Sequence, residues 1–306
     1  MLFILLRRFA FMGLSIFVVV TFIFLLVHLV PGDPVLQMLG EGAQPADVQQ
    51  LRHALGLDQS IQTQYLHYLH NLSHADLGLS FRYQEPVLKT LLKRYPATLE
   101  LSLASLLLAL LFSIPAGVQA AIKSNTGQDR WISFFSLLGL SLPNFALGPL
   151  LILLFSIQLM WFPVSGIGGL KHLVLPAVTL GLGLAAVTTR MVRSAMLEEL
   201  GQDYLRTAFS KGLPRRTVLY KHALKNSLIP IVTVVGLQFG NLLAGTFVTE
   251  SIFSWPGIGR LTLQAIQFRD YPLVQGCILA IALTYIVVNF LTDMAYIFVD
   301  PRIRIE

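Results

Sequence analysis

Residues 203–230 read DYLRTAFSKGLPRRTVLYKHALKNSLIP and form a charged, helix-forming segment between two long apolar segments. Gly212 divides this segment, because glycine takes the left-handed conformation that follows a helix C-terminus without a Cβ penalty. Lys211 suits the negative end of a helix dipole, and Pro214 suits the first turn of the next helix. The sequence therefore predicts two short helices, after which Pro230 marks the return to apolar sequence.

The first of these short helices has one apolar face. Leu205, Ala208 and Phe209 share that face by their i, i+3, i+4 spacing, and basic residues flank it. This pattern is typical of a helix that docks into a groove of a partner protein. A loop with ordinary basic charge would look similar, so the pattern alone leaves both interpretations open.

The rest of the chain is strongly apolar. Its 306 residues are 55% hydrophobic and 12% charged, with a mean hydropathy of +0.68. A soluble domain usually carries about a quarter charged residues, so the composition indicates a polytopic membrane protein. The net charge of +6 then reports membrane orientation rather than nucleic-acid binding. Because Cys277 is the single cysteine, neither an intrachain disulfide nor a cysteine-based metal cluster can form.

Apolar stretches long enough to cross a membrane recur along the chain when windows of about 19–20 residues are compared. They lie at residues 9–30, 97–122, 131–160, 173–193, 228–252 and 274–299. The third stretch is long enough to be tilted or kinked, and it contains Pro143 and Pro149. We therefore expect an all-α, polytopic membrane protein with six transmembrane helices.

Basic residues set the expected orientation. They concentrate in the connecting segments that lie inside when the N-terminus is inside, and six spans then place both termini in the cytoplasm. Residues 1–30 are expected to hold the N-terminal tail and first helix, residues 31–96 a small extracytoplasmic segment, and residues 97–306 the other five helices. Helical patterns at residues 45–55 and 62–72 predict that the extracytoplasmic segment is ordered.

The sequence also resembles a known family. RTAFSKG at 206–212 and HALKNSLIP at 222–230 are similar to the EAA-type coupling signature of ABC importer permeases, although Arg206 and Thr207 stand where the signature has its glutamate. Further motifs of that resemblance are PGDP at 31–34, GLDQ at 56–59, DLGLS at 76–80, PATLEL at 96–101, SLPNFALG at 141–148, HLVLPAVTLG at 172–181, FSWPGIGR at 253–260 and RDYPLVQG at 269–276. Together they resemble the inner-membrane permease subunits of dipeptide, oligopeptide and nickel ABC importers.

This resemblance implies a function and a set of partners. The chain would be a permease subunit in the bacterial inner membrane, importing peptides or nickel and metal chelates. A paralogous second permease would complete a heterodimeric channel, two ATPase subunits would bind coupling helices at about residues 203–226, and an extracytoplasmic solute-binding protein would deliver substrate. The sequence has no GxxxxGK[ST] motif, so ATP and Mg²⁺ would be bound by partner subunits, and no cofactor or enzymatic activity is expected of this chain. Its expected contacts are these proteins and membrane lipid, not nucleic acid.

Three groups of site residues are expected. Those that couple the chain to the ATPases are Leu205, Ala208, Phe209, Lys211, Gly212, Arg215 and Arg216. Those that line or gate the pathway, where small residues allow helices to approach and rearrange, are Gly139, Pro143, Gly148, Gly181 and Gly183. Those that contact the binding protein or the solute are Trp255, Gly257, Arg260 and Asp270, although a structural capping loop is the alternative for this group.

Two other functions are alternatives to that of an importer permease. An ion-coupled secondary transporter of small solutes would need coupling carboxylates at the membrane midplane. Glu100 and Asp293 instead lie toward the ends of their spans, which favours pairing or snorkelling. A membrane-embedded enzyme is disfavoured because the sequence has neither HExxH nor GxSxG.

A cluster of histidines allows a metal site as a further alternative. His67, His70 and His74 share one helical face by their i, i+3, i+7 spacing. The same stretch fits an amphipathic surface helix, which we favour because metal capture would belong to the separate binding protein. The sequence does not identify the substrate.

Overall fold

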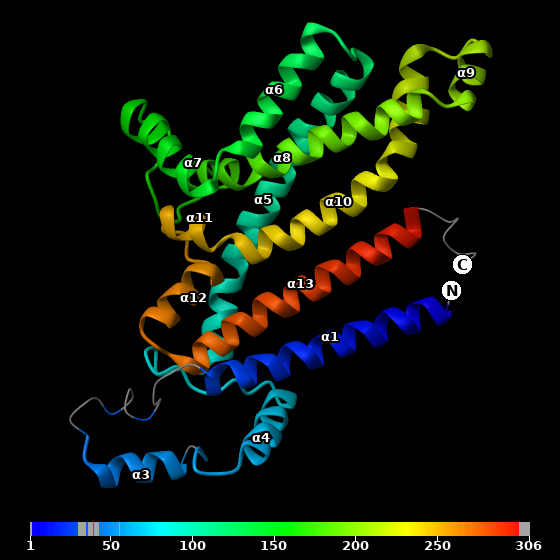
Figure 1. Ribbon diagram of the computed structural model, residues 1–306. Coiled ribbons are helices and arrows are strands. Elements are labelled where there is room, and N and C mark those ends of the chain that lie inside the picture. The colour runs from blue at the N-terminus through cyan, green and yellow to red at the C-terminus, as the bar shows by residue number, and fades with distance from the viewer. Residues whose placement is uncertain (1, 30–34, 36–38, 40–42, 55, 300–306) are drawn as a thin grey trace. The chain divides into compact units, whose positions relative to one another are not determined.

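The computed structural model describes residues 2–29, 35, 39, 43–54 and 56–299. Throughout these residues the named elements are helices, and the β-type pairing found there is one isolated bridge between Leu79 and Pro86 (Figure 1). The elements are α1 (Leu2–Leu29), α3 (Pro45–Ala54), α4 (Ile61–Ser73), α5 (Val87–Ile122), α6 (Gly127–Ser141), α7 (Asn144–Leu151), η1 (Ile152–Gln158), α8 (Leu170–Leu200), α9 (Asp203–Ser210), η2 (Thr217–Ala223), α10 (Leu224–Gly245), α11 (Phe247–Ile252), α12 (Ile258–Gln267) and α13 (Tyr271–Val299). The expected all-helical class is confirmed.

Four helices are long and apolar enough to cross a membrane, within α1, α5, α8 and α13. Two further candidates are bent pairs: Gly127–Ser141 with Asn144–Gln158 turns by 103°, and Thr217–Leu228 with Pro230–Gly240 turns by 51°. If each pair is one span, the total is six. The described part of the chain is thus a polytopic helical protein with four to six candidate spans.

The break in the third predicted span has a local cause. Leu142 is extended, with φ −87° and ψ 114°, and Pro143 precedes α7. A proline disfavours the helical conformation of the residue before it, so the helix ends at Ser141 and restarts after the proline. The sequence predicted a tilt or kink here, and the structure has a sharp turn instead.

The chain divides into two compact units, and each is described by itself. One unit comprises residues 97–256 with the end of α13, and the other comprises residues 2–96 with Gly257–Ile286. The division at Ala97 falls at the predicted end of the extracytoplasmic segment. Residues 257–286, which the sequence placed with the other helices of 97–306, group instead with the N-terminal part.

In the first unit, a buried tryptophan and a buried glutamate fix the segment that follows α10. The indole N–H of Trp255 donates to the carbonyl oxygen of Ala97 at 2.7 Å, and the hydroxyl of Thr98 donates to Glu250 at 2.8 Å. Trp255 and Glu250 are 1% and 0% exposed. Buried polar groups are costly without hydrogen-bond partners. These two bonds therefore hold α11 and the turn after it against the part of α5 that contains Ala97 and Thr98.

In the second unit, α1 packs through apolar side chains. Val20 and Ile23 of α1 form a cluster with Leu279 of α13, and Tyr68 and Leu72 of α4 pack against it. Helix α4 begins at the N-cap Ser60, whose Oγ accepts from the backbone N–H of Thr63, and it ends by Ser73. Helix α4 covers the helical pattern predicted at 62–72, and α3 covers most of the pattern predicted at 45–55.

Candidate functional site

The insert predicted at 203–226 folds as α9 followed by η2. Helix α9 ends in the turn that the sequence indicated, because Gly212 has a φ of +76° and donates its N–H to the carbonyl of Phe209 at 2.9 Å. A Cβ on Gly212 would meet no atom within 4 Å. The requirement for glycine is therefore conformational, worth about 1–2 kcal/mol, and not steric crowding.

The second half of the insert is a π-helix rather than an ordinary α-helix. The N–H of Val218 donates to the carbonyl of Pro214 at 3.2 Å, so the proline lies in the first turn as expected. Residues Thr217–Ala223 are π-helical and continue directly into α10. Such wide turns are frequent at functional sites, and the sequence contained no signal for this one.

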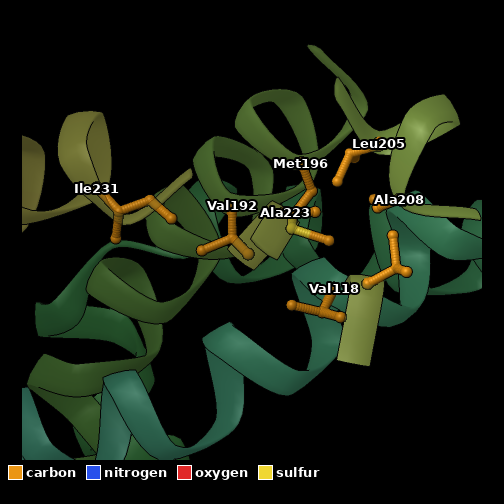
Figure 2. Packing of buried hydrophobic residues seen from close by; sticks show 9 residues of the cluster. Val118, Val192, Met196, Leu205, Ala208, Ala223 and Ile231 are labelled. Atoms are coloured by element: carbon orange, nitrogen blue, oxygen red, sulfur yellow. The ribbon is translucent and has the colours of Figure 1, made fainter. Parts of the chain in front are cut away.

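The apolar face of α9 packs inside the chain's own core. Leu205 is 1% and Ala208 is 9% exposed, and Figure 2 shows both side chains directed toward a cluster drawn from α5, α8, η2 and α10. The other buried members of this coupling core are Val118, Ala121, Val192, Met196, Val218, Ala223 and Ile231. The expectation that Leu205 and Ala208 form an open docking face is corrected: a helix this short is unstable alone and uses its apolar stripe to fold onto its own subunit.

The insert also carries a continuous exposed run after the buried Ala208. Every residue from 209 to 216 is exposed, including Phe209 at 45% and Leu213 at 38%. This run contains Lys211, Arg215 and Arg216. We name residues 209–216 the exposed loop: it presents apolar and cationic groups together, which are the groups that a protein partner can bind.

A hydrogen-bond chain fixes the start of α9. The Tyr204 hydroxyl donates to Glu199 at the end of α8 and accepts from the side-chain amide of Asn226 at 2.9 Å. Burial raises the pKa of the Tyr204 phenol above its usual range, and the bond to Glu199 adds to the rise. The phenol thus stays protonated and joins the two ends of the insert.

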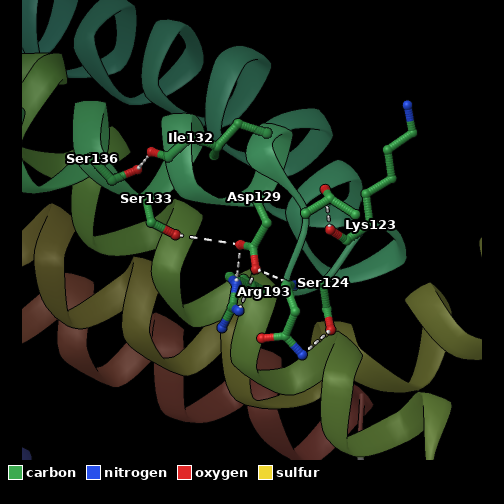
Figure 3. A network of polar contacts seen from close by, with 9 residues as sticks. Lys123, Ser124, Asp129, Ile132, Ser133, Ser136 and Arg193 are labelled. Atoms are coloured by element: carbon green, nitrogen blue, oxygen red, sulfur yellow. Dashed lines mark hydrogen bonds and ion pairs between the residues drawn. The ribbon is translucent and has the colours of Figure 1, made fainter.

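An ion pair beside the coupling core was missed in the sequence. The Arg193 guanidinium on α8 donates to both carboxylate oxygens of buried Asp129, from Nε at 2.6 Å and from Nη2 at 2.8 Å (Figure 3). The backbone N–H of Asn125 donates to the same carboxylate at 2.9 Å. The pair ties the turn between α5 and α6 to α8 in a bidentate geometry.

The candidate pathway residues divide by their surroundings. Pro143 stands at the 103° break between α6 and α7. A Cβ on Gly139 would lie 3.4 Å from an α8 side chain, one on Gly148 3.3 Å from α11, and one on Gly181 2.9 Å from the Ser105 carbonyl of α5. A Cβ on Gly183 would meet nothing within 4 Å, so no close helix approach within this chain requires a glycine there.

A glycine that the sequence reading passed over makes a tighter approach. A Cβ on Gly117 would lie 2.6 Å from Val192 and 2.7 Å from the Thr189 carbonyl, so α5 and α8 are in backbone contact there. A cavity of about 610 Å³ lies along the same helices and α6, and Gly139 is among its lining residues. Its walls are mostly apolar, with Ser113, Gln128, Ser136 and Thr189 as polar groups.

The residues expected to contact the binding protein or solute are mostly interior. Trp255 and Asp270 are each 1% exposed, Gly257 is buried, and Arg260 is half-buried. The expectation of surface contact is therefore corrected for three of the four. Trp255 and Asp270 make internal hydrogen bonds, which is compatible with the capping-loop alternative.

Asp270 organises the surface around it. Its Oδ2 accepts from the Ser80 hydroxyl at 2.6 Å and from the Arg82 backbone N–H at 3.1 Å. The Arg82 guanidinium lies 3.4 Å from the ring centroid of Phe268, which is 49% exposed. The stacked pair, with exposed Ile266 and Arg269, forms what we name the outer patch.

The predicted histidine face does not converge on one point. The rings of His70 and His74 lie 4.6 Å apart, and His74 Nδ1 is 2.9 Å from the carbonyl oxygen of His70. His67 lies at a separate pocket. Among the residues that the structure describes, no three or more histidine, cysteine, aspartate or glutamate side chains lie together so that they could hold a metal ion.

Comparison with known proteins gives concordant results. Residues 113–305 match the family of binding-protein-dependent transport system inner membrane components, and residues 1–103 match the N-terminal family of such membrane components. The chain is 41% identical over 290 residues to the glutathione transport system permease protein GsiC of Escherichia coli strain K12, covering 95% of each. The corresponding protein of Shigella flexneri serotype 5b is 40% identical over the same length. The fold resembles a chain of the inward-facing MetNI methionine ABC transporter, with a TM-score of 0.57 and 18% identity over 69% of this chain and 96% of that chain.

Proposed function

The chain belongs to the family of binding-protein-dependent transport system inner membrane components and is a permease subunit of an ABC importer, and we propose that its 203–226 insert couples it to the ATPases. It is a multi-pass protein of the bacterial inner membrane, and ATP hydrolysis resides in separate subunits. Family membership decides against the ion-coupled secondary transporter. The peptide-type relative is compatible with a peptide-class substrate, which we propose in preference to nickel or a metal chelate.

The observation that carries the coupling proposal is the division of the insert into two faces. Leu205 and Ala208 belong to the coupling core, whereas the exposed loop at 209–216 faces away from it. The ATPases would bind Phe209 and the cationic side chains Lys211, Arg215 and Arg216. Movement of the ATPases would then displace α9 as a rigid helix. Because interiors are close-packed, that motion would pass through Leu205 and Ala208 to the rest of the coupling core.

The proposed topology has six spans with both termini in the cytoplasm. Each bent pair then counts as one span, residues 31–96 are extracytoplasmic, and residues 97–306 form the core permease domain. Cysteines introduced at residues 43–50 and 210–220 are expected to react with membrane-impermeant reagents from opposite sides. Labelling of both from one side would overturn the topology.

The proposed partners follow from the family. A second, paralogous permease completes the pathway, two ATPase subunits bind the inserts, and a solute-binding protein delivers substrate. Gly139, Gly148 and Gly181 are retained as candidate pathway or gate residues because helices meet closely at them. Gly183 is not retained on that ground.

For the binding protein, we replace the interior motif residues by the outer patch. Arg82, Ile266, Phe268 and Arg269 present apolar and cationic groups at the surface, and the carboxylate of buried Asp270 accepts a hydrogen bond from the backbone N–H of Arg82. A cysteine at Phe268 is expected to cross-link to the binding protein, and one at Asp270 is expected not to. Equal yields from the two sites would contradict this placement.

The coupling proposal is tested by Phe209→Ala in the assembled permease pair. Loss of an exposed aromatic anchor at a protein interface costs about 2 kcal/mol, so affinity for the ATPases should fall more than tenfold. The matched control is Phe268→Ala, because that ring is 49% exposed against 45% for Phe209 and belongs to the outer patch. Affinity is measured without the binding protein. Equal affinity in both variants would refute docking at the exposed loop.

A further inference from the structure

A pocket lined by both polar and apolar groups lies in the unit that contains α1, α3, α4 and the first part of α13. Its volume is about 520 Å³, which is within the range of about 300–1,000 Å³ typical of small-molecule sites. One wall is a face of α4, where Gln64, His67, Tyr68 and Asn71 follow each other at i, i+3, i+4, i+7. Gln275 of α13 also lines the pocket.

The pocket's shape is held by local hydrogen bonds. The side-chain amide of Gln64 donates to the carbonyl oxygens of Gln59 at 2.9 Å and Leu57 at 3.4 Å, which fixes the α3–α4 turn against α4. His53 pairs with Asp58 across the same turn. Phe24 and Leu279, both buried, supply an apolar part of the lining. The site is thus preformed, with polar groups around an apolar portion.

The charge of the lining selects the ligand's charge. Asp76 is its carboxylate, and Lys and Arg are absent among the described residues that line it. One Asp76 oxygen accepts from the backbone N–H of Gly78 at 2.9 Å, which orients the group. A cationic group on the ligand is therefore favoured over an anionic one at Asp76.

The remaining polar groups favour amides. Gln59, Asn71 and Gln275 are carboxamides, each with an N–H₂ donor and a carbonyl acceptor. A peptide group offers the complementary acceptor and donor. A free peptide amino group has an ordinary pKa of about 7.7–8.0 and is mostly cationic at neutral pH. Amino group and peptide groups together match this lining better than a metal ion does.

We infer that this pocket is a second binding site for short peptides, with the ligand's amino group at Asp76 and its peptide groups among the carboxamides. The inference rests on the proposed peptide-class substrate and on the extracytoplasmic placement of residues 31–96. The pocket would be a substrate-binding site on the permease itself, and it shares no residue with the candidate pathway residues or with the outer patch.

The test uses the full chain in its permease pair, in nanodiscs without the binding protein, and tri-alanine as the probe. Saturation-transfer NMR is expected to detect binding of tri-alanine but not of N-acetyl-tri-alanine, which lacks the cationic amino group. Asp76→Asn keeps an oxygen for Gly78 and removes the charge, so affinity should fall about tenfold or more. Asp47→Asn, on exposed α3, is the matched control and should bind as the wild type does.

Asn71→Ala supplies a second variant should Asp76→Asn not fold, and it is expected to weaken binding by a smaller factor. The inference is overturned if tri-alanine does not bind, if both peptides bind equally, or if the Asp76 and Asp47 variants are indistinguishable. ATP-driven uptake of tri-alanine by the complete transporter is measured in parallel. Normal uptake without binding here would reject the pocket and leave the proposed function intact, whereas absent uptake would reject the peptide-class substrate.

Discussion

The insert helix α9 and the loop helix α12 are both short and amphipathic, and each lies beside a motif that the sequence marked as functional. Around α9 the marked residues fall on both faces, with Leu205 and Ala208 buried and Phe209 exposed. Around α12 most of the residues that the sequence predicted as contact residues are interior. The exposed side chains there belong to the outer patch, such as Ile266 and Phe268, and were not predicted as contact residues. Some motif residues are therefore buried and support a surface from within, whereas others are exposed and belong to the surface itself.

The comparison predicts its largest effect at Trp255. Trp255→Ala removes a side chain that is 1% exposed and leaves the Ala97 carbonyl without its 2.7 Å donor. We expect the free energy of unfolding to fall by about 3–5 kcal/mol. Denaturant unfolding in detergent measures this. Trp161→Ala, at a ring that is 60% exposed, is the control and should cost much less. Equal losses would mean that the loop motif does not stabilise the fold.

A cavity in the coupling core should have the next largest effect. Leu205→Ala is expected to destabilise the protein by about 2–4 kcal/mol, because the side chain is 1% exposed and packs in the coupling core. Phe209→Ala should change stability by about 0.5 kcal/mol or less, since this ring is 45% exposed. If Phe209→Ala were the more destabilising variant, the assignment of the two faces of α9 would be reversed.

The ion pair beside the coupling core should contribute somewhat less, because the Arg193 side chain is 30% exposed while that of Asp129 is 6% exposed. Asp129→Ala is expected to cost about 2–3 kcal/mol. The charge-swapped double variant Asp129→Arg with Arg193→Asp should recover part of this loss. Unfolding in detergent measures both, and a swap no more stable than the single variant would show that the pairing itself contributes nothing.

The fold was predictable where one residue decides a local conformation. Gly212 indicated a left-handed turn, and the span that contains Pro143 was expected to be tilted or kinked, because backbone preference acts within a few residues. The pair of Asp129 with Arg193 joins positions 64 apart in sequence, so no local pattern marked it. The face of α9 was ambiguous for a similar reason: apolar spacing shows that a helix has an apolar side, but not whether its own core or a partner covers it.

Substitution of Gly212 should change stability less than loss of the coupling-core leucine or of the ion pair. Gly212→Val should cost about 1–2 kcal/mol through its left-handed φ of +76°, with no steric clash because the space around it is open. We expect the protein to remain folded while substrate-stimulated ATP hydrolysis and transport fall together. Gly212→Asn is the matched control, since asparagine tolerates this conformation and should retain more activity. Normal transport by the valine variant would show that the insert is only a charged loop with no role in coupling.

Site-directed cross-linking of α9 to the ATPase tests the central claim most directly. Single cysteines are placed at Phe209 and at Leu205, and the native Cys277, which is buried, provides the background. The complete transporter is treated with a short bifunctional reagent in the presence and absence of ATP. The account predicts a strong, nucleotide-dependent adduct from position 209 and none above background from position 205. An adduct from position 205, or none from position 209, would contradict it.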